Sequence, residues 1–597
     1  MSLLFAAIAA ISSAEITYRV TLDPAANSLR VRIEVSDTSK GISVQIPNWA
    51  PGSYRLVDNF RNVKNLTAKD GAGRDLRIEQ VMAPSPKRYG DGDNIRTANN
   101  EICTWNIAPA ASTVIEYDMA SRLVDGAMHW SGPSTYMYVM GRINEPCRLH
   151  VSSPAKWPVY IGLDAVRGGT NEFTAPDYDV LADNPATVGE VLVDTYVSRG
   201  KPHYIVMRGT AKADVDREAL IKVCKFVTDM QTDFFRGDAP YNHYVWHFNV
   251  NDSPDGAGGL EHLSSTQISL ASGVGIGAIS VISHEFFHLW NVKRIRSAVL
   301  GPFNYTKLPE TGAIWWLEGV TDYYAHQLLY RYAWVDEPVF FADAASNITA
   351  IRRTPGLHEV SPYEASFRVS EAANGRGNSG GYKISYYPLG WVCGLLLDIE
   401  LIERTQGRYR LDDIELALWD LCGDGRPGFA EDEIRKQLIR FGGSEMGKVY
   451  DDIIMTKGDK PIEAYLAKAG LRLTQLRVPT TDFGFTAPAN ATNGMVIQRL
   501  TRPSETLKSG DRILKIGGET IAGSRRAQMV AFAKVREKAE PGVPIPITVK
   551  RGEETLELRF TPEFASRMET RVEKMAFITP QQRMVRDALM KQATFRP

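Results

Sequence analysis

The sequence predicts a multidomain α+β protein, and three changes of pattern along the chain lead to this fold class. Residues from about 15 to 205 alternate between apolar and polar in the manner of β-strands. From Asp214 the apolar residues recur with the period of helices, and beyond residue 475 short strand-like segments return. We therefore expect an N-terminal all-β domain, a central unit with a mostly helical second lobe, and a small C-terminal module.

The composition is that of an ordinary globular protein. The 597 residues leave room for several domains, and 44% of them are hydrophobic and 23% charged. The formal net charge is −1, and acidic and basic residues are intermixed. The sequence therefore has no basic region that would indicate nucleic-acid binding. No segment beyond residue 14 approaches the roughly twenty uninterrupted apolar residues of a membrane span, so we expect none.

Residues 1–14 have the character of a secretory signal peptide. A short apolar stretch ends in small residues at Ala14, as such signals do before their cleavage site. No Lys or Arg precedes the stretch, which departs from the usual signal, so a disordered terminus is the alternative. We expect export, which would make the mature chain periplasmic or secreted.

Five cysteines are scattered along the chain, and none belongs to a C-x-x-C pair. The sequence therefore predicts neither a thiolate zinc site nor a redox motif. In an oxidising compartment Cys103 could pair with Cys147. Cys393 lies in an apolar run and is expected in the core.

The N-terminal β domain is expected to span residues 15–205. Its strand pattern is clear in two successive runs, formed by Ile16, Tyr18, Val20 and Leu22 and then by Leu29, Val31, Ile33 and Val35. The central unit is expected over residues 206–475, beginning with a helix and a strand. Its second lobe would consist of helices near residues 389–403, 411–422 and 431–441.

The central unit contains the motif H-E-x-x-H, formed by His284, Glu285 and His288 in an apolar run. On a helix, positions i and i+4 share a face, so the two imidazoles can bind one metal ion while Glu285 lies beside them. This pattern predicts a zinc metallopeptidase with one zinc ion per chain. Glu285 would take a proton from a zinc-activated water and return it to the leaving amine.

A third zinc ligand is expected from a second helix. Catalytic zinc usually has three protein ligands and a water, so the motif needs one more residue. The segment Trp315–Asp322 reads W-W-L-E-G-V-T-D and has a helical apolar period. Glu318 is the candidate ligand. Asp322 shares its face at i+4 and is placed to orient one of the histidines from behind.

Two further segments carry a family resemblance. Pro47–Tyr54 reads P-N-W-A-P-G-S-Y, and Gly258–His262 reads G-G-L-E-H. The first resembles the N-terminal signature, and the second the substrate-strand motif, of the glycyl aminopeptidase family of gluzincin zinc metallopeptidases. The zinc-binding segments resemble the same family. The resemblance implies a thermolysin-like catalytic fold and the release of N-terminal Gly or Ala from peptides that have a free N-terminus.

Two adjacent tyrosines, Tyr386 and Tyr387, are candidates for the donor that stabilises the oxyanion formed during hydrolysis. A phenol can donate this hydrogen bond without becoming charged. In related aminopeptidases the donor lies in Y-E-K-G, and Tyr387–Gly390 (Y-P-L-G) matches the first and last positions. Tyr387 is therefore the first candidate and Tyr386 the alternative, and two packed core tyrosines are the non-catalytic interpretation.

Glu261 is the candidate for binding the free α-ammonium group that an aminopeptidase must hold. The resemblance assigns Gly258, Gly259, Glu261 and His262 to a substrate-binding edge strand. In the related motif G-A-M-E-N the glutamate has this role, whereas His262 departs from the last position. An edge-strand glutamate in water is the alternative.

Residues 476–562 form a separate module that contains D-F-G-F at Asp482–Phe485 and S-G-D-R-I-L at Ser509–Leu514. The module resembles a PDZ domain. The resemblance implies that backbone N–H groups of Phe483, Gly484 and Phe485 hold the carboxyl terminus of an extended peptide, although a structural role is the alternative. The tail, residues 563–597, is amphipathic and is expected to dock on a neighbouring domain.

Two other functions stay open beside the zinc aminopeptidase. The same zinc site could belong to an endopeptidase, which would accept a blocked amino terminus and would not need Glu261. The chain could instead be an inactive scaffold that binds peptides through its C-terminal module. The complete set of zinc ligands and general base favours an enzyme.

Overall fold

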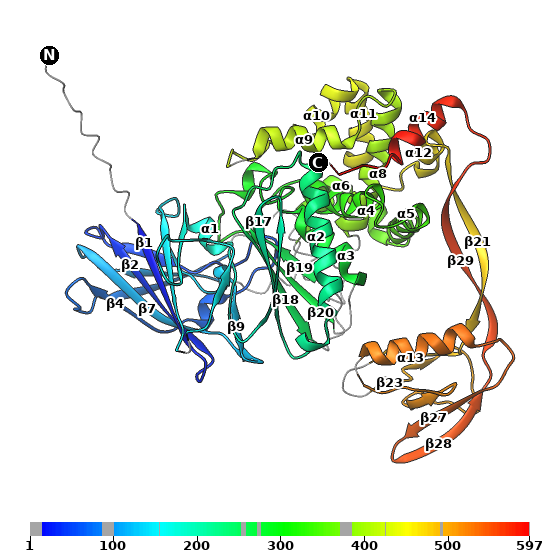
Figure 1. Cartoon of the computed structure of the whole chain (residues 1–597), viewed down its shortest axis with the longest axis horizontal. Helices are drawn as coiled ribbons and strands as arrows, with labels where there is room; N and C mark the ends of the chain where they lie inside the picture. Colours follow the sequence, from blue (N-terminus) through cyan, green and yellow to red (C-terminus); the bar gives the residue numbers. More distant parts are fainter. Residues whose placement is uncertain are drawn as a thin grey trace.

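The computed structural model describes most of the chain. The described residues are 15–85, 101–154, 156–251, 258–271, 276–369, 385–423, 425–489, 494–523 and 525–595. The signal-peptide prediction for residues 1–14 lies outside them. Figure 1 shows an N-terminal block of strands, a central unit of sheet and helices, and a small module carried on a two-stranded arm.

The N-terminal domain consists of three β-sheets around one apolar core. Its strands are β1 (Ile16–Asp23), β2 (Ser28–Ser36), β3 (Ile42–Gln45), β4 (Lys64–Asp70), β5 (Ile78–Pro84), β6 (Glu101–Ile107), β7 (Ser112–Ala120), β8 (Leu123–Val124), β9 (Ala127–Trp130), β10 (Tyr138–Val139), β11 (Cys147–Ser152), β12 (Val159–Ile161), β13 (Asp164–Ala165), β14 (Glu172–Ala175) and β15 (Ala186–Gly189). The sheets have the orders β13-β14-β11-β1-β2-β7-β4, β10-β3-β6-β5 and β12-β15-β9-β8. Alternate residues of β1 and β2 are buried, as their period predicts. A short helix, α1 (Tyr178–Ala182), follows β14.

The central unit begins with a five-stranded sheet. Its strands are β16 (Leu192–Ser198), β17 (Lys201–Arg208), β18 (Tyr244–Asn251), β19 (Gly258–Glu261) and β20 (Ser265–Ala271), in the order β16-β17-β18-β20-β19. The domain boundary expected at residue 205 falls inside β17, which pairs with both β16 and β18. The strand-like alternation continues across the true boundary near residue 190, so the pattern alone did not separate the two domains.

Helices complete the central unit and its second lobe. Those beside the sheet are α2 (Arg217–Phe234), α3 (Ile279–Phe287), the π-helical segment η6 (Trp315–Val320) and α4 (Thr321–Arg331). The lobe contains α5 (Glu337–Arg352), α6 (Pro362–Phe367), α8 (Tyr386–Arg404), α9 (Leu411–Cys422), α10 (Glu433–Gly442), α11 (Glu445–Tyr450), η8 (Asp451–Met455) and α12 (Ile462–Lys468). The three lobe helices expected from the sequence are confirmed as α8, α9 and α10, and one apolar core runs from the sheet into the lobe.

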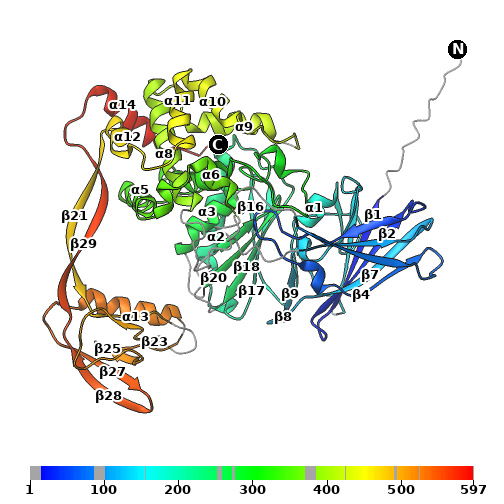
Figure 2. The same ribbon diagram turned by 180° about the vertical axis from the view of Figure 1, so that it is seen from behind.

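A two-stranded arm connects the lobe to the C-terminal module, as Figure 2 shows from behind. The strands β21 (Leu471–Asp482) and β29 (Glu563–Lys574) pair along their whole length. The module between them (residues 483–562) has its own core. Its elements are β22 (Phe485–Thr486), β23 (Met495–Val496), β24 (Arg499–Leu500), β25 (Arg512–Ile516), β26 (Glu519–Thr520), α13 (Arg525–Lys538), β27 (Ile545–Arg551) and β28 (Glu554–Phe560). The first part of the expected tail, residues 563–574, is thus the second strand of the arm.

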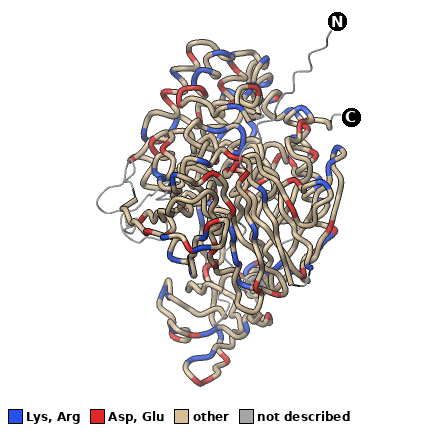
Figure 3. The backbone as a smooth tube through the Cα atoms, turned by 90° about the vertical axis from the view of Figure 1, so that its left-hand side faces the viewer, with Lys and Arg blue, Asp and Glu red and all other residues tan. Residues whose placement is uncertain are grey.

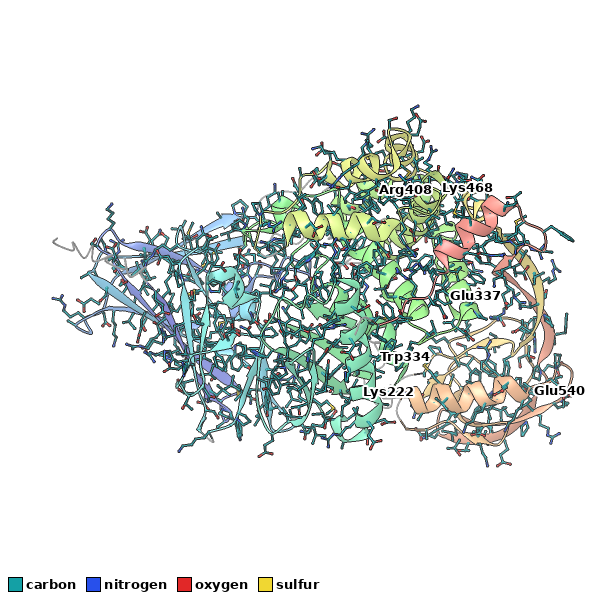
Figure 4. All side chains as sticks on the ribbon, turned by 45° about the horizontal axis from the view of Figure 1, so that its top comes forward. Lys222, Trp334, Glu337, Arg408, Lys468 and Glu540 are labelled. Carbon is teal, nitrogen blue, oxygen red and sulfur yellow. The ribbon has the colours of Figure 1, made fainter. Side chains whose placement is uncertain are left out.

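The remainder of the tail docks on the lobe. Its helix α14 (Pro580–Leu589) buries Val585 and Leu589 in the core of the central unit. The arm is fixed as well, since Lys574 forms a 2.7 Å ion pair with Glu337 at the start of α5, which is labelled in Figure 4. The predicted docking of the amphipathic tail is confirmed.

Cysteines and charges fit the same picture. All five cysteines lie in the described part of the chain, and each is buried and free, so the Cys103–Cys147 pair is not formed. Figure 3 shows Lys and Arg interspersed with Asp and Glu along the backbone. Among the described helices, none has the length and apolar character needed to cross a membrane.

Candidate metal centre

The helix α3 carries the H-E-x-x-H motif at its C-terminal end, in the interior of the central unit. Its apolar residues bury it between α2 and α4, and polar side chains fix it there: Gln231 donates to the Ser283 backbone carbonyl at 2.7 Å, and Ser283 Oγ donates to the Ala325 carbonyl at 3.0 Å. These contacts set the rotation of α3, so that His284 and His288 face the segment η6.

Three ligand atoms meet at one point. The Nε2 atoms of His284 and His288 lie 2.9 Å apart, and Glu318 Oε2 lies 3.6 Å from the first and 3.3 Å from the second. A tetrahedral zinc ion with Zn–N bonds of about 2.0–2.1 Å separates its ligands by about 3.3 Å. The buried donor set of two imidazoles and one carboxylate therefore fits zinc in both chemistry and spacing.

Both histidines are oriented from behind. His284 Nδ1 lies 3.3 Å from Asp322 Oδ1, and His288 Nδ1 donates to the Asn291 backbone carbonyl at 2.7 Å. The Nδ1 of His288 thus carries a proton, and in the neutral ring its Nε2 keeps a lone pair for a metal, while Asp322 lies next to Nδ1 of His284. The Asn291 side chain also donates to the Trp316 carbonyl at 3.2 Å, which ties the end of α3 to η6.

Glu318 is held in its ionised form. Burial alone would raise the pKa of its carboxyl group, but the neighbouring His288 and His284 outweigh this effect and lower the pKa below its usual value. The residue lies in the π-helical segment η6 rather than in a regular helix. Such segments are rare and are frequent at functional sites.

Glu285 lies beside the ligands and is the group placed to move protons. It is 6% exposed, and within the described part of the chain its Oε2 has no hydrogen-bond partner. Burial raises the pKa of Glu285 to about 7. The strand β19 passes directly over it, because a Cβ on Gly259 would lie 2.2 Å from Glu285 Cδ.

A glycine contact brings the tyrosines to the site. α8 crosses η6 so closely that a Cβ on Gly319 would lie 2.5 Å from Gly390 Cα. This crossing places the first turn of α8 beside the zinc ligands, where the ring of Tyr387 lies 5.7 Å from that of His284. Desolvation near the hydroxyl group and nearby carboxylates, first among them Glu318, raise the pKa of Tyr387 well above its usual value, although part of the side chain is exposed, so its phenol is a neutral donor.

Exposure separates the two tyrosines. Tyr387 is 37% exposed and faces His284, whereas Tyr386 is 4% exposed and packs into the core. A donor to a substrate oxygen has to be reachable from the cleft. The geometry therefore favours Tyr387 over Tyr386 as the oxyanion donor.

The strand β19 lies at the edge of the central sheet and carries Glu261 at its end. It pairs antiparallel with β20 on one side, so its other edge is free of a strand partner in the described ranges. Glu261 itself is only 5% exposed. It is covered by Gly52 of the N-terminal domain, where a Cβ would lie 2.6 Å and 2.8 Å from the two carboxylate oxygens. The Glu261 side chain is thus buried and not in open water.

The loop that carries Gly52 is part of the P-N-W-A-P-G-S-Y signature, and it is fastened to the central unit. Its Asn48 N–H donates to the Tyr305 carbonyl at 2.9 Å, and its Trp49 Nε1–H donates to the Asn304 carbonyl at 2.8 Å. Gly52 has φ +89°, which an L side chain rarely adopts. The N-terminal domain therefore supplies one wall of the site.

His262 does not face the cleft, and its expected role in substrate binding is wrong. Its ring is 4% exposed, with Nδ1 3.3 Å from Asp183 Oδ1 and Nε2 accepting from Gln267 Nε2 at 2.9 Å. Successive residues of a strand point to opposite faces, so Glu261 and His262 cannot both face a substrate. The ring points instead into the interface with the N-terminal domain.

The D-F-G-F loop of the C-terminal module lies on the separate core of that module. Phe483 and Phe485 are buried there and contact Phe532 and Phe560. The Gly484 N–H donates to Asp482 Oδ1 at 2.9 Å. In this structure one of the three N–H groups expected to hold a peptide carboxylate is thus occupied by a carboxylate of the chain itself.

Three contributors to the site were not found from the sequence: Asn291, Gly52 and Asp183. Asn291 follows His288 by three residues, and its proximity to the motif was a usable signal. Gly52 lies in the recognised N-terminal signature, but nothing in that signature points to Glu261. Asp183 has no motif around it, and only the packing of two domains shows its role.

Two family models match the chain. The model of the Peptidase M61 N-terminal domain matches residues 17–190, and the model of the M61 glycyl aminopeptidase matches residues 277–393. The second range contains the zinc ligands, Glu285 and Tyr387. Two separate parts of the chain are thus similar to domains described for M61 peptidases.

The solved structures show the same fold. The chain is similar to an aminopeptidase N family protein from Idiomarina loihiensis, with a TM-score of 0.72 and 21% identity, over 95% of this chain and 99% of that chain. An M1 zinc metallopeptidase from Deinococcus radiodurans is more distant, with a TM-score of 0.46 and 12% identity, over 76% of this chain and 96% of that chain. Among the curated proteins there is no match. The family match and the donor set together identify the chain as a zinc metallopeptidase.

Proposed function

We propose that this chain is a zinc-dependent aminopeptidase that removes Gly or Ala from the amino terminus of peptides. The observation that carries the proposal is the buried carboxylate of Glu261, at the end of an edge strand that crosses Glu285 and beneath the Gly52 loop. An ionised carboxylate in a buried position needs a partner, and a free α-ammonium group would be that partner in an aminopeptidase. The preference for Gly rests on the family description.

The peptide would bind in extended form along the free edge of β19. Main-chain hydrogen bonds to an edge strand hold a peptide of any sequence, as in other strand-addition complexes. With its amino terminus on Glu261, the first peptide bond would lie over Glu285 and the zinc ligands, because β19 crosses Glu285 at Gly259. The wall formed by Gly52 would stop longer register shifts, so that one residue is removed at a time.

The residues around the metal supply the remaining chemistry. A zinc ion held by His284, His288 and Glu318 would polarise the scissile carbonyl and would lower the pKa of a water molecule towards about 7. Glu285 takes a proton from that water and returns it to the departing amine. Tyr387 donates a hydrogen bond to the oxygen that becomes negative. Asp322 and the Asn291 carbonyl hold the histidines in place.

Two finer predictions also remain proposals. Residues 483–562 are proposed to be a PDZ-like domain that binds peptide carboxyl termini at Phe483, Gly484 and Phe485, and a bound carboxylate would have to displace Asp482 from the Gly484 N–H. The second proposal is export through a signal peptide at residues 1–14. Cleavage after Ala14 would leave Glu15 as the first residue, so the amino-terminal sequence of the secreted protein tests it.

The aminopeptidase proposal is tested with one Gly-initiated peptide, free or acetylated at its amino terminus. Product masses are recorded with and without a zinc chelator. Release of Gly from the free peptide alone, abolished by the chelator and restored by zinc, supports the proposal. Internal cleavage of both peptides would show an endopeptidase, and no chelator-sensitive cleavage of either would favour the peptide-binding scaffold.

A further inference from the structure

The interface between the N-terminal domain and the central sheet contains a cluster of polar side chains, most of them buried. Its members come from both sides: Asp183, His129 and Thr187 from the N-terminal domain, and His247, His262, Gln267 and Lys293 from the central unit. Buried polar groups destabilise a fold unless each has a partner.

The hydrogen bonds form one continuous series, in which each group donates to the next. His247 Nδ1 donates to Thr187 Oγ1 at 2.8 Å, Thr187 donates to His129 Nδ1 at 2.8 Å, and His129 Nε2 donates to Gln267 Oε1 at 2.5 Å. Gln267 Nε2 then donates to His262 Nε2 at 2.9 Å. His262 Nδ1 must carry the proton and points it at Asp183 Oδ1, 3.3 Å away.

Burial favours the neutral form of two of these histidines, His129 and His247. It lowers the pKa of His129 to about 3 and the pKa of His247 well below its usual value. This series of hydrogen bonds ends at Asp183, the one charged acceptor in it. Burial alone would raise the pKa of Asp183, but Lys293 and His262 outweigh it and hold the pKa at about 2. The ion pair of Asp183 with Lys293 measures 2.6 Å.

Asp183 therefore connects the two halves of the site. Its Oδ2 accepts from the Leu263 N–H at 2.7 Å, immediately after the strand that carries Glu261. Its other partner, Lys293, lies just beyond the zinc helix and donates its own N–H to the His288 carbonyl at 3.1 Å. One carboxylate of the N-terminal domain thus holds the amine-binding strand and the zinc-binding segment at a fixed separation.

We propose that Asp183 is a positioning residue of the amine site: with His262 and Lys293, it sets the place of Glu261 relative to the zinc ligands. The inference rests on the proposed aminopeptidase function and extends it, because it makes the N-terminal domain responsible for the preference for a free amino terminus. A shift of about 1 Å in such a group is enough to lower turnover about 100-fold.

The test measures discrimination, which a merely structural residue would not change. The full chain is assayed with Gly-p-nitroanilide and with its N-acetylated form, and the ratio of their kcat/KM values is compared among variants. Asp183→Asn keeps the size of the side chain and removes its charge. The expected result is a 10- to 100-fold lower ratio, mostly through a higher KM for the free amine, with unchanged zinc content.

His262 provides a variant that leaves the Asp183–Lys293 ion pair intact. His262→Phe removes both hydrogen bonds and should lower the ratio in the same way, whereas His262→Asn places an N–H near the Nδ1 position and should restore part of it. If Asp183→Asn does not fold, these two variants carry the test. Lys212→Met is the matched control, since Lys212 crosses the same interface through Asp125 O and Glu190 O, far along the sequence from Glu261.

The outcomes separate the two proposals. If the wild-type chain cleaves both substrates equally well, the proposed aminopeptidase function fails, whatever the variants do. If the wild type discriminates but folded Asp183→Asn and His262→Phe keep its ratio, the function stands and the positioning role of Asp183 is overturned. A uniform loss of both activities together with zinc would also overturn it, because that is the effect of general unfolding.

Discussion

The metal half and the amine half of this site are built in opposite ways. The zinc ligands, Glu285 and Asp322 all lie between positions 284 and 322, on helices that follow one another along the chain. The amine half combines Glu261 on an edge strand with Gly52 and Asp183 from a different domain. In the proposed mechanism the chemistry depends on residues at local spacing, whereas the choice of substrate depends on how two domains pack.

Substitutions in the metal half should cause the largest loss of activity. Glu285→Gln removes the proton carrier without removing a zinc ligand, so we expect kcat to fall about 10³- to 10⁴-fold while zinc stays bound. Turnover of Gly-p-nitroanilide and the zinc content after dialysis are the two measurements. Near wild-type turnover would contradict the mechanism. Glu318→Ala is the contrasting variant, because it should lose zinc as well as activity.

The two tyrosines can be distinguished by removing each hydroxyl. Tyr387→Phe should lower kcat about 10²- to 10³-fold with little change in KM, because the lost hydrogen bond forms in the transition state. Tyr386→Phe should change kcat by less than about threefold. Steady-state kinetics at saturating substrate measures both. The reverse order of effects would assign the oxyanion donor to Tyr386.

The amine half should lose selectivity before it loses turnover. In Gly52→Ala the new Cβ would lie within 2.8 Å of both Glu261 carboxylate oxygens, so Glu261 has to move. We expect KM for Gly-p-nitroanilide to rise about tenfold, with a smaller change in kcat. Gly73→Ala is the matched control, since Gly73 has a similar φ of +81° in the same domain but no neighbour within 4 Å. Equal effects of the two substitutions would refute a wall at Gly52.

The smallest expected effect concerns stability beneath the metal half. Glu415 accepts a hydrogen bond from Trp316 at 3.0 Å, and burial raises its pKa to about 8. The unfolded chain releases this proton near pH 4.3, so between about pH 4.3 and 8 the buried carboxyl group lowers the free energy of unfolding as pH rises. Glu415→Gln should therefore raise Tm by a few degrees at pH 8 and hardly at pH 5. A difference in Tm that does not change with pH would contradict this.

The residues of the metal half could be predicted from the sequence because helical spacing is local. His284 and His288, and then Glu318 and Asp322, are each four residues apart, and this spacing places them on one helix face without knowledge of the rest of the fold. The π-helical form of η6 was not predicted, because the apolar period of this segment indicates only a helix. The lobe helices α8, α9 and α10 were predicted because their apolar periods are long.

The interface between the N-terminal domain and the central sheet could not be predicted from the sequence, because the packing of two domains leaves no periodic pattern. β16 and β17 alternate like the strands before them, so only their pairing with β18 shows that they belong to the central sheet. His262 lies in a recognised motif, yet its direction follows from the pleat of β19 and from the position of Asp183. The resemblance to a PDZ domain and the expected export stay predictions.

The arm has a consequence for how the molecule can be re-engineered. β21 and β29 remain in register along their full length, from Leu471 and Lys574 to Asp482 and Glu563. The chain therefore leaves and re-enters the arm at neighbouring positions, and the module of residues 483–562 is an inserted cassette. Replacing it with a short turn would close the arm into an ordinary β-hairpin. The catalytic machinery could then be studied, or fitted with another recognition module, without cutting its own core.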